Sequence, residues 1–227
     1  RTISRMLSEK LATPSYPPRE VWQENLSALP LVSKLRWDYS LQRYNTMKIG
    51  GNAACFIEVD SFDDLSRLLP WIEEQALPWV ILGKGSNLLI PDSGWPGIVL
   101  RLGKEFKQWQ VYPERQRVYA GAGLADVTIA QKCLRVGLSG LEFLIGVPGT
   151  LGGAIAMNAG AHQAEMADFL IKVRWMDMQG HIHTSEIAEI DFRYRYSSIC
   201  GATNKVILDA ELQLEISSPQ KIKEKVE

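Results

Sequence analysis

The chain has 227 residues, of which 46% are hydrophobic and 22% are charged. These values are typical of a globular protein with one or two domains, and they exclude a disordered or fibrous chain. The 25 basic and 26 acidic residues leave a formal net charge of -1. This balance argues against a dedicated nucleic-acid binder and against a protein of anionic membranes. The 18 glycines are clustered, which indicates loops where the backbone comes close to another group.

The three cysteines, Cys55, Cys133 and Cys200, include no C-x-x-C pair. They indicate neither a disulfide framework nor a cysteine zinc site, and they are typical of a reducing compartment. Residues 1–11 lack the apolar core of a signal peptide. Residues 143–161 carry no charge, but their five glycines and Pro148 favour a glycine-rich loop region over a membrane helix. We therefore expect a cytoplasmic protein without a membrane partner.

In the first half of the chain, strands and helices are expected to alternate. Residues 1–36 are broken by Tyr16-Pro17-Pro18 and are predicted to form a loosely attached arm or short helices. A helix over 65–72 follows a possible capping box that starts at Ser61. The strands expected around this helix cover residues 55–59, 79–82, 87–90 and 97–102. The order strand, helix, strand predicts a small α/β lobe over residues 37–102.

The second half favours antiparallel sheet, so residues 103–216 are predicted to form a larger α+β lobe. A helix over 125–135 is expected to stop at Gly137. The strands expected in this lobe cover 108–112, 117–120, 171–178, 181–185 and 206–216. The first two are expected to form one hairpin, and the next two are expected to form another through a turn at Gln179-Gly180. Ser218-Pro219 is typical of the start of another helix, and we expect residues 217–227 to begin a further domain.

A first candidate binding segment lies between two apolar stretches. Glycines at positions 83 and 85 permit positive φ, so that successive backbone N–H groups can form a nest for an anion such as pyrophosphate. An ordinary turn between strands is the competing interpretation. The segment is neither a Rossmann fingerprint nor a Walker A loop. Its candidate cofactor-binding residues are Gly83, Lys84, Gly85, Ser86, Asn87 and Leu88.

A second candidate segment has four glycines within residues 146–153, a density that ordinary packing does not need. Its backbone must either turn tightly or lie against a flat or charged ligand, although a glycine-rich crossing of two elements is also possible. Gly121-Ala122-Gly123 is a weaker instance of the same pattern. The candidate cofactor-binding residues here are Gly121, Gly123, Gly146, Pro148, Gly149, Thr150, Gly152, Gly153 and Asn158.

A third segment, residues 192–197, alternates aromatic and basic residues. As a strand, it would place Arg193, Arg195 and Ser197 on one face, either solvated or ready to bind a carboxylate through a guanidinium group. His181 and His183 also alternate, but no third ligand is evident, so we predict no metal site.

Several segments follow one another in an order that resembles one enzyme family. They are residues 45–51, 82–89, 137–144, 146–153 and 158–161, followed by Tyr194-Arg195-x-Ser197. Together they resemble the UDP-N-acetylenolpyruvoylglucosamine reductases, also called UDP-N-acetylmuramate dehydrogenases. The resemblance runs from about Tyr44 to about Glu215.

The resemblance implies a two-lobed FAD-binding fold of the vanillyl-alcohol-oxidase (PCMH) type, α+β overall, with FAD held between the lobes. It implies a flavoprotein oxidoreductase of peptidoglycan synthesis, and hence of cell wall biogenesis, cell shape and cell division. In that family NADPH reduces FAD, the flavin passes hydride to the enolpyruvyl group of a UDP-sugar, and a protein acid protonates the adjacent carbon. By the same resemblance, Arg195 matches the catalytic arginine and Tyr194 lines the substrate site.

Two features depart from the family pattern. Lys84 stands where many members have glycine, which is tolerable if only the backbone is used there. The family's proton-donating serine lies in a Gly-Ser-x-Phe-x-Asn-Pro segment, which these 227 residues do not contain. We therefore expect this chain alone to bind flavin with little or no turnover. Another flavin oxidoreductase of the same fold and a non-catalytic flavin-binding module are the alternatives.

Overall fold

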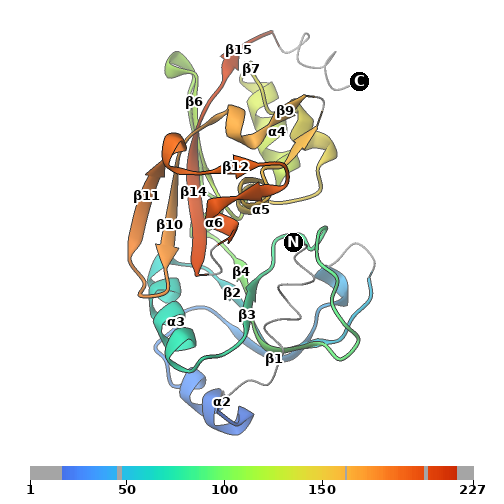
Figure 1. The fold of residues 1–227 in the computed structure, drawn as a ribbon, viewed down its shortest axis with the longest axis vertical. Coiled ribbons are helices and arrows are strands. Elements are labelled where there is room, and N and C mark those ends of the chain that lie inside the picture. The colour runs from blue at the N-terminus through green and yellow to red at the C-terminus, as the bar shows by residue number, and fades with distance from the viewer. Residues whose placement is uncertain (1–16, 45–47, 162, 202–203, 219–227) are drawn as a thin grey trace. The chain divides into compact units, whose positions relative to one another are not determined.

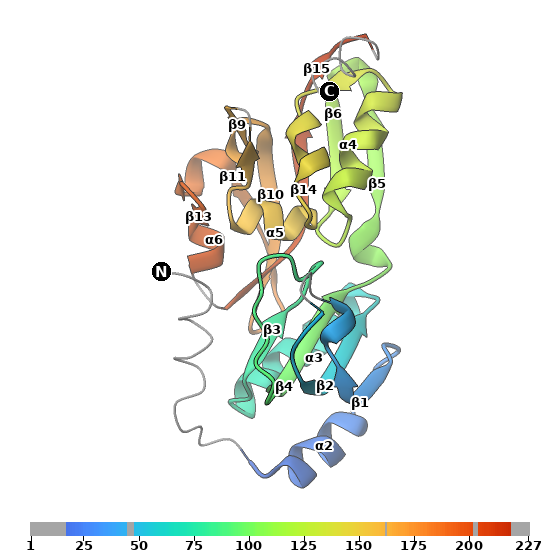
Figure 2. The ribbon, with the colours of Figure 1, turned by 90° about the vertical axis from the view of Figure 1, so that its right-hand side faces the viewer.

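The computed structural model describes residues 17–44, 48–161, 163–201 and 204–218 (Figures 1 and 2). The chain divides into two compact units. The first comprises residues 1–104 and 178–180, and the second comprises residues 105–177 and 181–227. Among the described residues, no helix combines the length and the apolar character needed to cross a bilayer.

The first unit contains a four-stranded sheet in the order β1-β2-β4-β3. β2, β4 and β3 run parallel to one another, and β1 is an edge strand antiparallel to β2. The strands are β1 (Leu35–Ser40), β2 (Asn52–Val59), β3 (Trp79–Ile81) and β4 (Trp95–Leu102). β2 and β4 are buried along most of their length because parallel strands are covered on both faces. This pattern confirms the predicted α/β organisation.

Helix α3 (Phe62–Glu74) follows β2 and buries Leu65, Leu68, Leu69 and Ile72. It starts where predicted, because the Ser61 hydroxyl oxygen accepts a hydrogen bond from the Asp64 amide at 3.1 Å. The buried Asp64 carboxylate in turn accepts hydrogen bonds from the Val32 amide, the Ser33 amide and the Ser33 hydroxyl. The first turn of α3 therefore holds the chain segment that leads into β1.

In the described part of residues 1–36, the expected loosely attached arm is wrong and the alternative, a short helix, is confirmed. Helix α2 (Arg19–Ser27) buries Trp22 and Leu26, and the Trp22 ring packs against Trp37 with centroids 5.6 Å apart. A large aromatic residue on one face of a short helix stabilises it by burial rather than by helix propensity. The remainder of the expected arm, residues 1–16, lies outside the described residues.

The second unit contains a five-stranded antiparallel sheet in the order β11-β10-β14-β6-β5. Its strands are β5 (Trp109–Tyr112), β6 (Arg117–Gly121), β10 (Leu170–Asp177), β11 (Ile182–Glu186) and β14 (Lys205–Gln213). The predicted hairpins β5–β6 and β10–β11 are confirmed. The last predicted strand breaks at Leu214, after which β15 (Glu215–Ile216) pairs with β7 (Leu138–Ser139).

One face of this sheet carries a charged network across three strands. The Arg174 guanidinium on β10 donates to both oxygens of the buried Asp209 on β14, at 2.8 and 2.6 Å, and to the Tyr119 hydroxyl on β6 at 2.6 Å. The pKa of Arg174 is raised chiefly by Asp209, and burial raises the pKa of Tyr119 to about 12. The bidentate contact between Arg174 and Asp209 therefore links β10 to β14 in one register.

The other described elements of the second unit are three helices, several short 3-10 turns and small two-stranded pairings. Helices α4 (Asp126–Arg135) and α5 (Leu151–Ala156) contact η4 (Glu142–Gly146) and β14, respectively. Residues 143–161, which lack charge, form most of η4, a loop, the short helix α5 and the strand β8 (Gly160–Ala161). β8 pairs with β9 (Ala164–Glu165), and β12 (Phe192–Arg193) pairs with β13 (Tyr196–Ser197) ahead of α6 (Ser198–Gly201).

Candidate functional site

The first candidate segment, residues 83–88, forms an irregular turn in the first unit and is called the glycine loop below. The strand predicted over 87–90 is wrong. The Leu82 amide still pairs with the Leu100 carbonyl at 2.8 Å, but the chain then leaves the sheet. Leu82 and Ile90 are both buried in one apolar cluster, and Leu88 packs against it. The cluster therefore anchors both ends of the loop, and the exposed side chains of Lys84, Ser86 and Asn87 lie between these anchors.

The backbone of the glycine loop meets part of the expectation for an anion nest. Gly85 has φ +69°, in the left-handed region, whereas Gly83 does not have positive φ. A single left-handed residue after Lys84 turns neighbouring N–H groups toward one side, as a nest requires. The loop geometry is therefore compatible with a phosphate ligand, and no side chain is needed for that role.

The glycines at 50 and 51, quoted above as part of a family motif, have a packing reason. Gly50 has φ +103°, and a Cβ there would lie 2.7 Å from the Ile90 carbonyl oxygen. A Cβ on Gly51 would lie 2.6 Å from the Gly94 amide nitrogen. Real Cβ atoms do not approach so closely, so glycine is required where residues 50–51 pass residues 90–94. Gly50 and Gly51 therefore pack against residues 90–94, the segment that follows the glycine loop.

In the second unit, residues 121–126 lie antiparallel to residues 149–152. The Gly152 amide donates to the Ala122 carbonyl at 2.9 Å, the Leu151 amide to the Leu124 carbonyl at 2.9 Å, and the Asp126 amide to the Gly149 carbonyl at 3.2 Å. Two of the candidate segments are thus brought together. Because the first two N–H groups of α5 are bonded to this partner strand, they are not available to a phosphate group.

Three of the candidate glycines are needed where this crossing is tight. A Cβ on Gly121 would overlap the Phe106 carbonyl, one on Gly149 would overlap the buried Asp126 carboxylate, and one on Gly152 would lie 3.0 Å from the Ala122 Cβ. The alternative left open by the sequence, a glycine-rich crossing of two elements, therefore explains Gly149 and Gly152 without a ligand, and packing against Phe106 explains Gly121. Their roles in cofactor binding remain predictions.

Gly146 and Gly153 differ from these three. Among the described residues, and apart from the chain neighbours of each glycine, no atom lies within 4 Å of a Cβ built on Gly146, and a Cβ on Gly153 meets the Thr150 hydroxyl oxygen at 3.6 Å. Both glycines and Pro148 are exposed. The glycine-rich segment thus has a backbone surface without side chains, which a flat or phosphorylated group such as FAD could approach closely. In this respect the residues present fit the cofactor that the resemblance implies.

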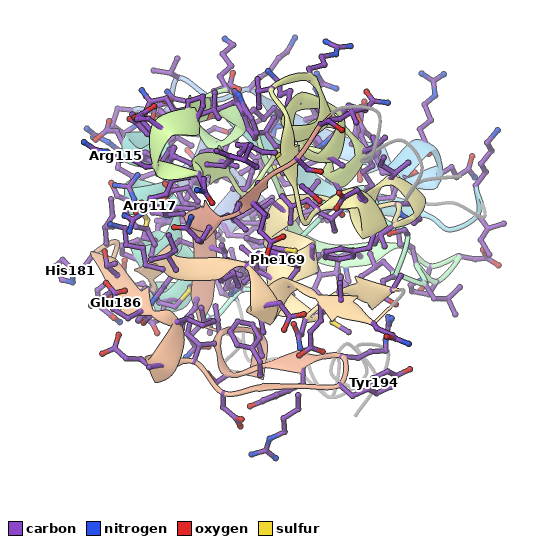
Figure 3. The ribbon with its side chains drawn as sticks, turned by 90° about the horizontal axis from the view of Figure 1, so that it is seen from above. Arg115, Arg117, Phe169, His181, Glu186 and Tyr194 are labelled. Carbon is purple, nitrogen blue, oxygen red and sulfur yellow. The ribbon has the colours of Figure 1, made fainter. Side chains whose placement is uncertain are left out.

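The segment that carries Arg195 is not the single strand predicted for residues 192–197. It is a hairpin in which Tyr194 and Arg195 form the turn between β12 and β13, and Tyr194 is labelled there in Figure 3. Arg195 has φ +52°, so the alternation of faces breaks at this residue. Tyr194 is 90% exposed and Arg195 is also exposed, whereas Ser197 is fully buried. Sequence alternation could not identify a two-residue turn that lacks glycine, asparagine and proline.

Asn158 lies directly after α5 and is only 3% exposed. Its side-chain amide donates to the Arg193 carbonyl at 3.4 Å, and its side-chain oxygen accepts from the Ala167 amide at 3.1 Å. This candidate cofactor ligand therefore contacts the backbone beside the Tyr194–Arg195 turn. Its sequence neighbours predicted a loop, but nothing in them indicated a partner 35 residues away.

The motif at 137–144 forms a local turn. The Ser139 hydroxyl donates to one oxygen of the Glu142 carboxylate at 2.5 Å, and the Gly140 amide donates to the other at 2.7 Å. Gly140 has φ +135° and faces the Phe169 ring, where a Cβ would lie 2.6 Å from a ring carbon. These hydrogen bonds thus fix the backbone conformation of the residues that immediately precede η4.

The predicted absence of a metal site rested on the lack of a third ligand near His181 and His183. The structure brings Asp177 close to both, with its Oδ2 2.6 Å from His183 Nε2 and 3.6 Å from His181 Nδ1. His183 also stacks on Trp175, with ring centroids 4.3 Å apart. Within the described ranges, no group of three or more His, Cys, Asp or Glu side chains has the arrangement of a metal site.

Comparison with known proteins identifies the class of this fold. Residues 53–186, more than half of the chain, match the family model described as FAD binding domain. Alkyldihydroxyacetonephosphate synthase has the same fold, with a TM-score of 0.60 and 17% identity over 90% of this chain and 45% of that one. The chain therefore belongs to the FAD binding domain family, and the predicted α+β flavin-binding fold is confirmed.

More similar relatives narrow this class. A UDP-N-acetylenolpyruvoylglucosamine reductase 1 of Bacillus cereus is 36% identical over 84% of this chain, and the Bacillus subtilis reductase is 37% identical over 86%. The crystal structure of the Thermus caldophilus reductase matches with a TM-score of 0.70 and 33% identity over 86% of this chain and 66% of that one. These relatives show that the chain is a member of the UDP-N-acetylenolpyruvoylglucosamine reductase family, as predicted. It spans 63% of the Bacillus cereus relative and 62% of the Bacillus subtilis one.

Proposed function

We propose that this chain is the FAD-binding part of an enzyme that reduces the enolpyruvyl ether of UDP-N-acetylglucosamine to UDP-N-acetylmuramate, with NADPH as the reductant, in the cytoplasm. The observation that carries the proposal is the similarity to reductases of that name over more than four fifths of the chain. Peptidoglycan precursor synthesis is the corresponding process.

The glycine loop and the exposed backbone of residues 146–153 are the segments proposed to hold FAD. The left-handed turn at Gly85 supports an anion contact, and the uncovered Gly146 supports close approach of a planar group. When bound, FAD supplies hydride transfer from NADPH to the enolpyruvyl double bond. The chain's own contribution in these segments is to fix the cofactor through its backbone and to leave room for it.

Arg195 is proposed to bind the carboxylate of the enolpyruvyl group. Hydride addition to the double bond places negative charge on the carbon next to that carboxylate, and the charge spreads onto its oxygens. A guanidinium held against those oxygens stabilises the transition state more than the ground state, which raises turnover rather than affinity alone. Exposure of Arg195 at a hairpin turn is compatible with substrate contact, and Tyr194 beside it would line the same site.

The experiment uses a form of the protein that has the full length of its relatives. Arg195→Ala is expected to lower kcat about 1,000-fold while the flavin stays bound, since the loss of a transition-state contact leaves cofactor binding intact. NADPH oxidation that depends on the enolpyruvyl substrate measures turnover, and flavin absorbance measures occupancy. Unchanged turnover would refute the role assigned to Arg195.

The 227-residue polypeptide itself is expected to be yellow and to have little substrate-dependent turnover, because it lacks the segment in which the family carries its proton donor. A change in the flavin spectrum on adding the UDP-sugar to the longer form would support this substrate class. Normal turnover by the 227-residue polypeptide would contradict the expectation.

A different flavin oxidoreductase of the same fold receives less support. Such relatives often attach flavin covalently through His or Cys. Cys55 and Cys133 are buried, and burial raises the pKa of both thiols to about 12. Neither cysteine is then a thiolate at neutral pH, and neither is accessible to a flavin ring. Retention of flavin by the polypeptide after denaturation and gel filtration would revive this alternative.

A further inference from the structure

We propose that the C-terminal end of α5, residues 156–158, positions Arg195 by holding both strands of the β12–β13 hairpin. Asn158 and Ser197 are the positioning residues. The inference rests on the proposed role of Arg195 in substrate binding, and it gives Asn158 a different task from the flavin contact expected from sequence. Figure 1 shows the β12–β13 hairpin beside α5, and α5 contacts β13 and α6.

The backbone at Asn158 forms a Schellman cap. The Asn158 amide donates to the Ile155 carbonyl at 3.1 Å, and the Ala159 amide donates to the Ala154 carbonyl at 2.8 Å. Asn158 itself has φ +41°. Glycine is the usual residue at this left-handed position, and asparagine is the less common choice. The left-handed backbone therefore does not by itself require a side chain at residue 158. We infer that the role of Asn158 lies in the hydrogen bonds of its side-chain amide.

The Asn158 amide group links α5 to two other segments. Its oxygen accepts from the Ala167 amide at 3.1 Å, and its nitrogen donates to the Arg193 carbonyl at 3.4 Å. Because Asn158 is 3% exposed and both hydrogen bonds are part-buried, loss of the amide would leave the Ala167 amide and the Arg193 carbonyl without these partners at a cost in stability. Arg193 is the last residue of β12 and lies two positions before Arg195.

The opposite strand is held by the preceding turn of the same helix. The Ser197 hydroxyl, which is fully buried, donates to the Ala156 carbonyl at 3.0 Å. Ser197 is the last residue of β13 and lies two positions after Arg195. At the base of the hairpin, the Ser198 amide donates to the Asp191 carbonyl at 2.9 Å, and the Asp191 amide donates to the Ser198 hydroxyl at 3.1 Å. Contacts to the C-terminal end of α5 therefore lie two residues before and two residues after Arg195.

Such fastening matters because the turn has an unfavourable backbone conformation. Arg195, the second of the two turn residues, has φ +52°, a conformation that glycine or asparagine adopts more readily. An arginine at this position persists only where the surrounding contacts impose the turn. The contacts from Asn158 and Ser197 supply that constraint, and they fix the point from which the guanidinium reaches its ligand.

The first test uses limited trypsin digestion of the 227-residue polypeptide. Trypsin cleaves after Arg193 and Arg195, so the rate of cleavage at these bonds reports local unfolding of the hairpin. The exposed Arg115 in the β5–β6 turn is an internal reference site. We expect Asn158→Gly, which keeps the left-handed cap, and Ser197→Ala to accelerate hairpin cleavage about fivefold relative to Arg115, because each loses a net hydrogen bond. Equal rates in variants and wild type would overturn the proposal.

Two further variants sharpen this test. Asn158→Asp keeps the acceptor for Ala167 but places an oxygen against the Arg193 carbonyl, so it should accelerate cleavage like Asn158→Gly. Wild-type cleavage of Asn158→Asp would contradict a role for the Arg193 contact. Ser185→Ala removes a comparable hydroxyl, which accepts from the Trp175 ring at 3.1 Å in the β10–β11 hairpin. It should leave cleavage at Arg193 and Arg195 unchanged, and acceleration there would point to general loosening of the unit instead.

The second test is a double-mutant cycle in the form of the protein that has the full length of its relatives. Asn158→Gly is expected to lower kcat about tenfold with the FAD dissociation constant within twofold of wild type. Added to Arg195→Ala, it should have no further effect on kcat, because a positioning residue acts through the group that it positions. A full tenfold loss in the Arg195→Ala background, or loss of FAD in Asn158→Gly, would overturn the positioning role.

The two tests separate this inference from the proposed function. If Arg195→Ala keeps wild-type turnover, the proposed function of Arg195 fails, whereas faster hairpin cleavage in Asn158→Gly still shows that α5 holds the hairpin. If Arg195→Ala abolishes turnover but Asn158→Gly leaves both cleavage and kcat unchanged, only the positioning role fails. Circular dichroism of each variant checks that the unit remains folded.

Discussion

Two glycine-rich regions of this molecule owe their glycines to different physical causes. Where residues 121–126 cross residues 149–152, glycine is present because neighbouring protein atoms occupy the space that a Cβ would need. In the glycine loop of the other unit, Gly85 is present because the backbone is left-handed, and the loop's ends are anchored by Leu82 and Ile90. The comparison teaches that a cluster of glycines indicates close backbone approach, but not whether a ligand or the protein itself approaches.

The largest effect is expected at Gly121. In Gly121→Ala the new Cβ would overlap the Phe106 carbonyl, which is backbone and cannot rotate away. We expect a loss of about 3 kcal/mol in the free energy of unfolding, measured by urea denaturation of the 227-residue polypeptide.

Gly146→Ala is the matched control, because no atom of the described residues beyond its chain neighbours lies within 4 Å of its Cβ position. It should change the unfolding free energy by less than about 0.5 kcal/mol. Equal destabilisation by the two variants would break the distinction between packed and uncovered glycines.

Gly149→Ala is expected to have the next largest effect on stability. Its Cβ would overlap the buried Asp126 carboxylate, a side chain with some freedom to move, so the cost should be smaller, about 2 kcal/mol. FAD titration monitored by flavin fluorescence should show affinity unchanged in the folded fraction. A large loss of affinity without loss of stability would move Gly149 into the group that contacts the ligand.

Gly85→Ala tests the other kind of glycine. An alanine at φ +69° costs about 1 kcal/mol of stability, since the left-handed region is strained for residues with a Cβ. If the loop is an anion nest, FAD affinity should fall by about tenfold, and adenosine diphosphate should weaken in parallel as a competitor. Full FAD affinity in a destabilised Gly85→Ala variant would show that the turn serves only the fold.

The smallest effect is expected at Lys84. Its side chain is exposed, and the nest uses backbone groups, so Lys84→Ala should leave stability within about 0.5 kcal/mol of wild type. FAD affinity should change less than about threefold, a residual effect of one screened charge. A larger loss that disappears at high salt would instead assign the ammonium group a direct contact with phosphate.

Local sequence patterns determined most of the regular elements of this protein. The apolar run of β2, the helical spacing of Leu65, Leu68, Leu69 and Ile72, and the Ser61 cap are signals carried by neighbouring residues. The hairpins of the antiparallel sheet follow from the same kind of signal. The order of the motifs also determined the family, because it needs no knowledge of contacts between distant residues.

Tertiary structure decided what those patterns leave open. The apolar residues 88–90 do not form a strand, because Leu88 and Ile90 pack beside Phe56 and Leu82 instead of pairing with β4. Residues 17–36 join the first unit because Trp22 is buried there and the Asp64 carboxylate binds the backbone of Val32 and Ser33. In both cases the deciding contact joins residues far apart in the sequence, which periodicity does not encode.

The same limit explains the candidate site. The sequence by itself identified Arg195 through its motif and identified the glycines through their density. Only the tertiary structure separated Gly121 and Gly149, which are packed against carbonyl and carboxylate groups, from the uncovered Gly146. It also placed Arg195 in a left-handed turn held by Asn158 and Ser197. Chemical identity is local to a residue, whereas the free space around it and the partners that hold it depend on the folded chain.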